Sequence, residues 1–96
     1  MKKITLHDVI NEQLKDKKFS EHYEKELLIN AIAKVVLEMR QAAHLTQKEL
    51  AKRAGTTQPV IARLEKGSDK RVPSLLLLER IARAARAKLR ISFEFK

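Results

Sequence analysis

The sequence predicts an all-α protein that forms one small helical bundle and ends in a short β-strand. Through most of the chain, apolar residues recur at steps of three and four, which is the period of amphipathic helices. Residues 88–96, KLRISFEFK, instead alternate apolar and polar side chains, which is the period of a strand. A chain of 96 residues can bury one modest core, so we expect a single domain whose stability benefits from oligomerisation.

The first expected element is a short helix near the N-terminus. Thr5 can cap this helix, and Asp8 stands three residues later in the position of a capping box. The helix carries a thin apolar stripe made of Val9, Ile10 and Leu14. A charged stretch at residues 16–18 then interrupts the pattern.

A longer helix is expected from Ser20 to about Ala43. Its core-facing stripe is predicted to be Leu28, Ile32, Val35 and Met39. Neighbouring apolar residues widen this stripe, so the helix has more surface to bury than one neighbour covers. Two explanations stay open, a longer local core or a surface for a partner protein.

The pattern that follows indicates two short helices joined by a tight turn. Thr46 and Glu49 have the spacing of a capping box, and Thr57 is the N-cap candidate of the second helix. Gly55 stands between them, where the chain needs a positive φ to turn off a helix end. The apolar residues expected inside are Leu50, Ala51, Ala54, Ile61 and Leu64. This is the arrangement of a helix-turn-helix, whose second helix enters the major groove of DNA.

A last helix is expected from Leu75 to about Ala87, with Ser74 as its N-cap. The face against the core should consist of Leu78, Ile81, Ala82 and Ala85. The run of leucines at 75–78 makes this helix apolar on more than one side, which favours a two-fold dimer contact.

No other segment of the sequence has a clear strand period, so the predicted C-terminal strand has no evident partner strand within the chain. A lone strand leaves its backbone donors and acceptors unpaired, and pairing with the same strand of a second copy would satisfy them. The weak strand pattern at the start of the chain, or a partner protein, could also do so. The predicted dimer interface combines the last helix and the strand and consists of Leu76, Leu77, Leu89, Ile91, Phe93 and Phe95.

Composition excludes several classes of protein. The net charge is +9, and all of the excess positive charge lies in residues 39–96, which suggests a polyanionic partner for that half. Without cysteine there is no disulfide or thiolate metal site, and no apolar run is long enough to span a membrane. The histidines at positions 7, 22 and 44 are scattered on polar faces. We therefore expect a cytoplasmic protein that is not an enzyme and needs no metal or other cofactor.

The expected DNA contacts follow from side-chain chemistry. Gln58 can contact adenine with two hydrogen bonds and Arg63 can contact guanine in the same way, although a phosphate contact is the alternative for Arg63. Pro59 and Val60 can contact thymine methyl groups. Phosphate contacts are expected at the helix N-termini, from Gln47 and Thr57.

This region resembles the DNA-binding core of the lambdoid phage repressors and of the wider XRE family. The matching segments are Leu45-Thr46-Gln47, Glu49-Leu50-Ala51, Gly55, Gln58, Ile61 and Glu65-Lys66-Gly67, and the departure is Pro59. The resemblance implies a lambda-repressor-like bundle in which Arg40 pairs with Glu65. It also implies a loop along the DNA backbone, with phosphate contacts from Lys66, Lys70 and Arg71.

The layout of the whole chain resembles the HigA-type antitoxins. The matching segments of the last helix and tail are Pro73-Ser74-Leu75, Leu78-Glu79-Arg80-Ile81-Ala82 and Leu89-Arg90-Ile91-Ser92-Phe93-Glu94. This resemblance divides the chain into a toxin-binding segment (1–38), an XRE core (39–87) and a dimerisation strand (88–96).

The resemblance implies a homodimer that binds double-stranded operator DNA, represses its own operon and neutralises a RelE-like mRNA-cleaving toxin by direct binding. The alternative is a free-standing XRE-type repressor with no toxin partner. The expected toxin contacts are Val9, Ile10, Leu14, Phe19 and Tyr23.

Overall fold

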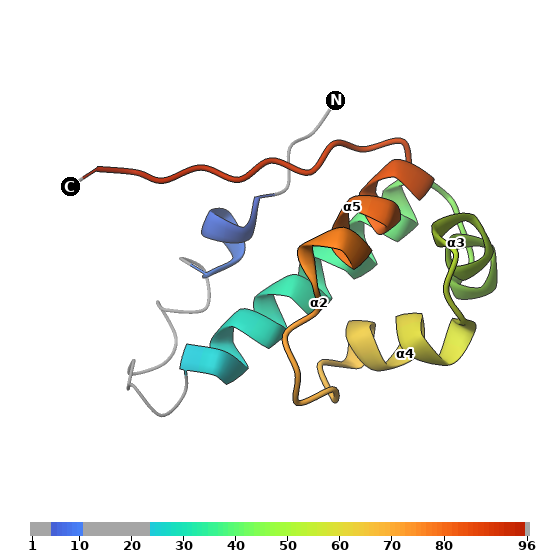
Figure 1. The fold of residues 1–96 in the computed structure, drawn as a ribbon, viewed down its shortest axis with the longest axis horizontal. Helices are drawn as coiled ribbons and strands as arrows, with labels where there is room; N and C mark the ends of the chain where they lie inside the picture. Colours follow the sequence, from blue (N-terminus) through green and yellow to red (C-terminus); the bar gives the residue numbers. More distant parts are fainter. Residues whose placement is uncertain (1–4, 11–23, 96) are drawn as a thin grey trace.

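The computed structural model describes residues 5–10 and 24–95. Residues 6–10 are helical, and the main helices are α2 (Glu24–Ala42), α3 (Gln47–Ala54), α4 (Gln58–Lys66) and α5 (Leu75–Ala84). In the view of Figure 1, α5 is drawn across part of α2, and α3 and α4 lie to the right of and below them. No helix within the described residues has the length and apolarity needed to cross a membrane.

The predicted helix–turn–helix core is confirmed. Leu50, Ile61 and Ile81 are the largest fully buried side chains of the described chain, and they come from α3, α4 and α5 respectively. α3 packs against both α4 and α5, while α2 packs against α4. Each short helix therefore contributes one aliphatic side chain to a shared centre, and burial of these side chains holds the angle between α3 and α4.

The core-facing side of α2 matches the predicted stripe except at one position. Ile32 is buried, and the half-buried Leu28 and Met39 pack against the core. The exception is Val35, which is only half-buried, whereas its neighbour Val36 is buried in the core. Apolar residues lie on both sides of the stripe, so the period alone does not distinguish Val35 from Val36.

The start of α3 has the predicted capping box. The backbone N–H of Glu49 donates to Thr46 Oγ1 at 3.0 Å, and the backbone N–H of Thr46 donates to Glu49 Oε1 at 3.0 Å. The hydrogen bond from the Thr46 backbone N–H to the Glu49 carboxyl group lowers the pKa of that group, and the Thr46 side chain acts in the same direction. α3 ends at Gly55, whose φ of 72° places it in the left-handed region as expected.

The start of α4 is capped less well than predicted. Thr57 has the extended backbone of an N-cap, but its side chain makes no capping hydrogen bond. An N-cap oxygen usually accepts from the second or third residue of the helix, and here the second residue is Pro59, which has no N–H. At its other end, α4 stops at Gly67, with φ 67°.

α5 begins at the predicted cap but ends early. The backbone N–H of Leu77 donates to Ser74 Oγ at 3.1 Å. The helix ends at Ala84 instead of Ala87, because Arg86 adopts a φ of 58° and turns the chain off the helix.

The predicted C-terminal strand is not formed. Residues 88–95 run as an extended segment, hereafter the tail, with no strand pairing among the described residues (Figure 1). A strand is defined by hydrogen bonds to another backbone, so strand periodicity in one segment is insufficient by itself.

Candidate nucleic-acid interface

One side of α4 is buried and the opposite side is open to solvent. Ile61 and Leu64 are buried in the core, whereas Gln58, Pro59 and Arg63 are exposed. Val60 is half-buried at the edge between the two sides. The four predicted base-reading residues therefore lie on a short helix that keeps its polar side chains outside the core.

Gln58 is held by a side chain from the preceding helix. Its Nε2 donates to Gln47 Oε1 at 2.8 Å, and Gln47 Nε2 in turn donates to Glu65 Oε1 at 3.0 Å. A glutamine amide carries two N–H donors and one carbonyl acceptor. After its bond to Gln47, Gln58 still has one N–H and its carbonyl oxygen, which are the two groups that a bidentate contact to adenine uses.

The predicted Arg40–Glu65 ion pair is confirmed and anchors this arrangement. Arg40 Nε lies 2.7 Å from Glu65 Oε2, and Arg40 Nη2 donates to Glu65 Oε1 at 3.0 Å. The side chains are 15% and 4% exposed, and Arg40 Nη1 also donates to the Leu45 carbonyl at 2.8 Å. The carboxylate hydrogen bond raises the pKa of Arg40 despite the opposing effect of burial, and Coulomb attraction to Glu65 acts in the same direction.

Together these contacts form a continuous path from Arg40 through Glu65 and Gln47 to Gln58. The path joins the end of α2, the end of α4, and the first turns of α3 and α4. It restricts the rotamers of Gln58 before any ligand arrives, which lowers the entropy that a contact would lose. From the sequence, Gln47 was predicted to contact phosphate, and its hydrogen bond to Gln58 was not predicted. The position of both glutamines as the first residues of consecutive helices could have indicated that their side chains lie close together.

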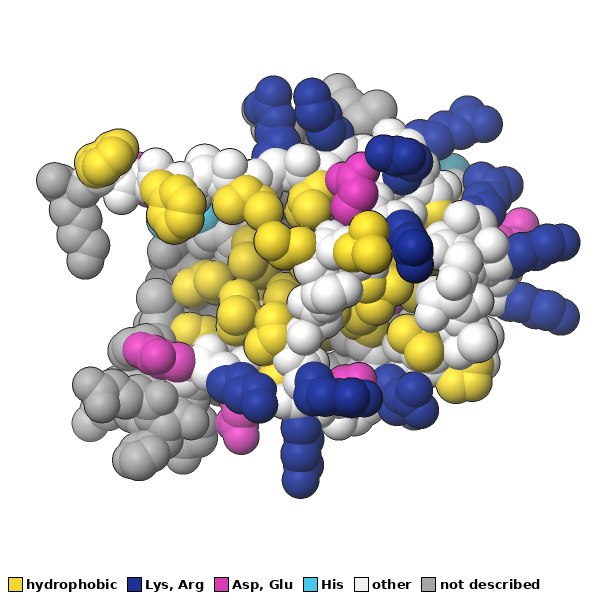
Figure 2. Space-filling model, viewed as in Figure 1, with side chains coloured by type: hydrophobic (Ala, Val, Ile, Leu, Met, Phe, Trp, Pro, Cys, Tyr) yellow, Lys and Arg dark blue, Asp and Glu magenta, His cyan; other side chains and the backbone are white. Residues whose placement is uncertain are grey.

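Positive side chains gather at the C-terminal end of α4 and in the loop that follows it. Lys66 is exposed at the end of the helix, and Lys70 and Arg71 are exposed in the loop between α4 and α5. At the other end of α4, the uncharged Thr57 is also exposed. Figure 2 shows several Lys and Arg side chains along the edge of the molecule where this loop lies. Arg71 is 90% exposed, its Nε lies 3.8 Å from Asp69 Oδ1, and it stays available to an anion.

The predicted dimer residues are mostly exposed. Leu76, Ile91, Phe93 and Phe95 are 60% to 97% exposed, whereas Leu77 and Leu89 are half-buried. Such large apolar side chains in contact with water indicate a surface that gains free energy when it is covered.

The predicted toxin contacts fall into two groups. Val9 is 4% exposed, so its side chain already packs within this chain, and Ile10 is half-buried. Leu14, Phe19 and Tyr23 lie outside the described residues. In the ranges 5–10 and 24–95, no group of His, Cys, Asp and Glu side chains has an arrangement that could hold a metal ion.

Comparison with known proteins agrees with this geometry. The family described as Helix-turn-helix matches residues 36–90. An uncharacterized HTH-type transcriptional regulator of Methanothermobacter thermautotrophicus is 50% identical over 50 residues, covering 52% of this chain and 70% of that protein. A second uncharacterized HTH-type transcriptional regulator, from Archaeoglobus fulgidus, is 45% identical over 60 residues, covering 62% of this chain and 82% of that protein. No solved structure gives a significant match. The chain therefore belongs to the XRE-type helix-turn-helix family of transcriptional regulators.

Proposed function

We propose that this protein is an operator-binding repressor in which α4 reads the major groove. The observation that carries the proposal is the exposed amide of Gln58, which is held by Gln47 at the start of α4. Arg63 is exposed on the same helix, and two side chains suited to adenine and guanine can provide sequence preference, at about 1–3 kcal/mol for each bidentate contact. Pro59 and Val60 add apolar contacts to thymine methyl groups.

Phosphate contacts supply the remaining affinity. In this proposal Gln47 and Thr57 contact the backbone at the helix N-termini, and Lys66, Lys70 and Arg71 contact it from the following loop. These residues set the salt dependence of binding and carry no sequence information.

The proposed repressor is a homodimer. A second copy related by a two-fold axis would place two α4 helices about one turn of DNA apart, at roughly 34 Å, and would recognise a palindromic operator. The exposed apolar side chains of α5 and of the tail support this arrangement, because a dimer removes them from water.

We further propose that the regulator is the antitoxin of a HigBA-like pair and that its protein partner is a RelE-like toxin. This assignment rests on the likeness of the chain layout and of the tail motif to HigA-type antitoxins. Ile10, which is only half-buried, and the neighbouring N-terminal segment are the proposed contact region. A free-standing repressor would use the same DNA surface without this partner.

DNA binding is tested by fluorescence anisotropy with the intergenic DNA that precedes the gene and with a scrambled duplex. We expect salt-sensitive binding of both duplexes and tighter binding of the first. Gln58→Ala combined with Arg63→Ala should remove the preference and leave the non-specific binding. Arg83→Ala serves as the matched control, because it removes an exposed arginine on α5 that pairs with the nearby Glu79. An unchanged preference in the double variant would refute the assignment of α4 as the reader.

The toxin partner is tested by purifying the tagged protein from its own cells. Recovery of a small basic protein that cleaves mRNA supports the antitoxin assignment. Recovery of the regulator alone, from cells in which the gene is expressed, supports the free-standing repressor.

A further inference from the structure

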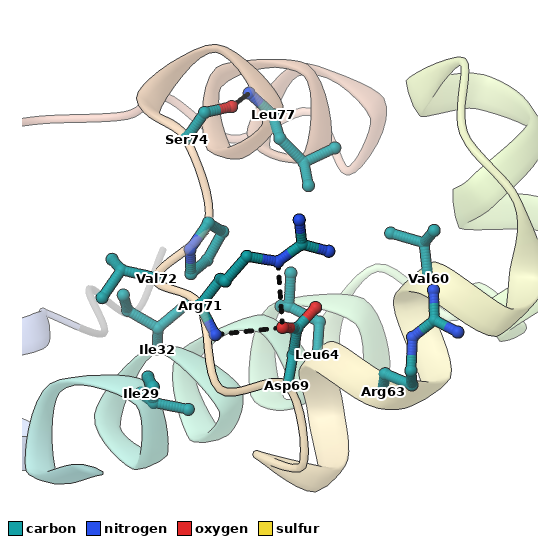
Figure 3. A pocket seen from close by; sticks show the side chains of 11 residues that line it. Ile29, Ile32, Val60, Arg63, Leu64, Asp69, Arg71, Val72, Ser74 and Leu77 are labelled. Carbon is teal, nitrogen blue, oxygen red and sulfur yellow. Dashed lines mark hydrogen bonds and ion pairs between the residues drawn. The ribbon is translucent and has the colours of Figure 1, made fainter. Parts of the chain in front are cut away.

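A groove with an apolar floor opens next to the recognition helix. It lies between α2, α4, α5 and the loop at residues 68–74, with a volume of about 300 Å³. Figure 3 shows the side chains that face into it, and the apolar ones include Ile29, Ile32, Leu64, Val72 and Leu77. A cavity of roughly 150 Å³ is enough to take a benzene molecule, so this groove is large enough for a phenyl ring.

The mouth of the groove is positively charged. Arg63 and Arg71 both line it, and Figure 3 shows the Arg71 guanidinium between Leu64 and Leu77. The one acidic lining residue, Asp69, lies 3.8 Å from Arg71, so the lining has two arginines and one carboxylate and keeps a net positive charge. An occupant should therefore combine a large apolar side chain with a negative charge.

The tail of this same chain has that chemistry. Phe93 and Phe95 are 91% and 97% exposed, and Glu94 stands between them with an 83% exposed side chain. Glu94 Oε2 lies 3.9 Å from His7 Nε2, which is also largely exposed, and a contact between two exposed side chains contributes little. Both phenyl rings of the tail are thus in contact with water in the isolated chain, and Figure 2 shows apolar side chains along this segment.

The path of the tail favours the groove of another copy over its own. The groove lies at the start of α5, whereas the tail leaves the end of α5 and runs along the side of the molecule away from α4 (Figure 1). The extended residues 88–95 can reach about 26 Å, at about 3.3 Å per residue. A segment of this length that runs along the side opposite α4 (Figure 1) can contact a neighbouring copy.

We propose that the tail of each protomer docks into the groove of its partner. A phenyl ring of Phe93 or Phe95 contacts Leu64, Val72 and Leu77, and Glu94 pairs with Arg71. This inference rests on the proposed homodimer and specifies its contact: the tails exchange between grooves and do not pair with each other as strands. Because two identical contacts form around one two-fold axis, the assembly closes as a dimer.

Engineered cysteines test this contact directly, because the natural sequence contains no cysteine. One preparation carries Phe95→Cys, a second carries Val72→Cys, and the two are mixed and oxidised mildly. Docking predicts a disulfide between the two different variants that forms at least about tenfold faster than with Lys52→Cys. That control places an exposed cysteine on α3, a helix that contributes no lining residue to the groove.

Each alternative geometry gives a different product. Predominant disulfides between two Phe95→Cys chains would show tail-to-tail pairing and overturn the proposal. A disulfide within one chain of the Phe95→Cys, Val72→Cys double variant, at a concentration where the protein is monomeric, would show that the tail occupies its own groove and would also overturn it. Equal rates for Val72→Cys and Lys52→Cys would show that the groove is empty.

A charge exchange provides a second test by sedimentation without DNA. Glu94→Arg and Arg71→Glu should each weaken dimerisation by about two- to fivefold, which is the range of an exposed ion pair. The combined variant should recover the dimer, and failure to recover it would refute the Glu94–Arg71 contact.

Binding of the natural protein to DNA is measured separately by fluorescence anisotropy. A protein that binds DNA but shows no cross-linking refutes only the tail contact, and a cross-linked dimer without DNA binding refutes only the proposed function.

Discussion

Replacement of Glu65 by alanine gives the sharpest test of how the recognition helix is held. The Glu65 carboxylate is 4% exposed and accepts hydrogen bonds from Arg40 and from Gln47. Its removal leaves the largely buried guanidinium of Arg40 without its counter-charge, which typically costs about 3–5 kcal/mol. Arg40 keeps its bond to the Leu45 carbonyl and is 15% exposed, so we expect the lower end of this range, ~3 kcal/mol.

That loss is large for a protein of this size. Small domains have unfolding free energies of about 5–15 kcal/mol, and each kcal/mol changes Tm by about 4–8 °C. We therefore expect Glu65→Ala to lower Tm by roughly 12–24 °C. Urea unfolding followed by circular dichroism at 222 nm gives the free energy directly.

A matched variant distinguishes the loss of this buried ion pair from the loss of an exposed one. Glu79 and Arg83 form a pair of 2.9 Å on α5, but their side chains are 42% and 82% exposed. Glu79→Ala should cost only about 0.3–0.5 kcal/mol, as exposed i, i+4 pairs do. A loss below about 1 kcal/mol for Glu65→Ala, comparable to that of an exposed pair, would refute the argument that this pair anchors α4.

The remaining predictions concern the helix ends. The pKa of Glu49 is lowered in the folded protein, so its contribution to stability is present above the unfolded pKa and is lost as the pH falls through the folded pKa. Glu49→Gln should therefore flatten the decrease in unfolding free energy at acidic pH. An unchanged decrease would contradict the capping box. His44 has a φ of 57°, which glycine adopts without strain, so His44→Gly should stabilise the fold by about 0.5–1 kcal/mol in urea unfolding, and a loss of stability would show that another contact of His44 matters more. A Cβ at Gly67 would lie 2.8 Å from Asn30 Oδ1, whereas one at Gly55 would meet no atom within 4 Å. Both glycines have positive φ, so Gly67→Ala should lower Tm more than Gly55→Ala, and equal losses would mean that Asn30 moves aside freely.

The features that could be predicted correctly are those that depend on residues close together in the chain. The capping box at Thr46, the cap at Ser74 and the turn at Gly55 each require a donor, an acceptor or a φ value within three or four residues. The helix–turn–helix core could also be predicted, because Leu50 and Ile61 have spacings that leave few other ways to bury them. The Arg40–Glu65 pair was predicted only through the family resemblance, since no local rule connects residues this far apart.

Two of the predictions that failed have local causes: Pro59 removes a donor from the cap at Thr57, and the φ of Arg86 ends α5 early. The other two depend on a surface supplied by another part of the structure. Val36 of α2 is buried where Val35 was predicted, and which of these two neighbours is buried depends on where α4 lies. The predicted strand at residues 88–96 has the correct alternation, but its backbone needs a second strand that this chain does not supply among the described residues.

The sequence alone thus determines where the short helices begin, where the chain turns between them and which aliphatic side chains form the hydrophobic core. Capping hydrogen bonds and apolar periodicity both depend on residues only a few positions apart. The packing angle between α3 and α4 specifies the rest of the site, because it brings Gln47 within 2.8 Å of Gln58 and within 3.0 Å of Glu65. A distance between side chains on two helices depends on how those helices pack, and that packing is a property of the assembled core.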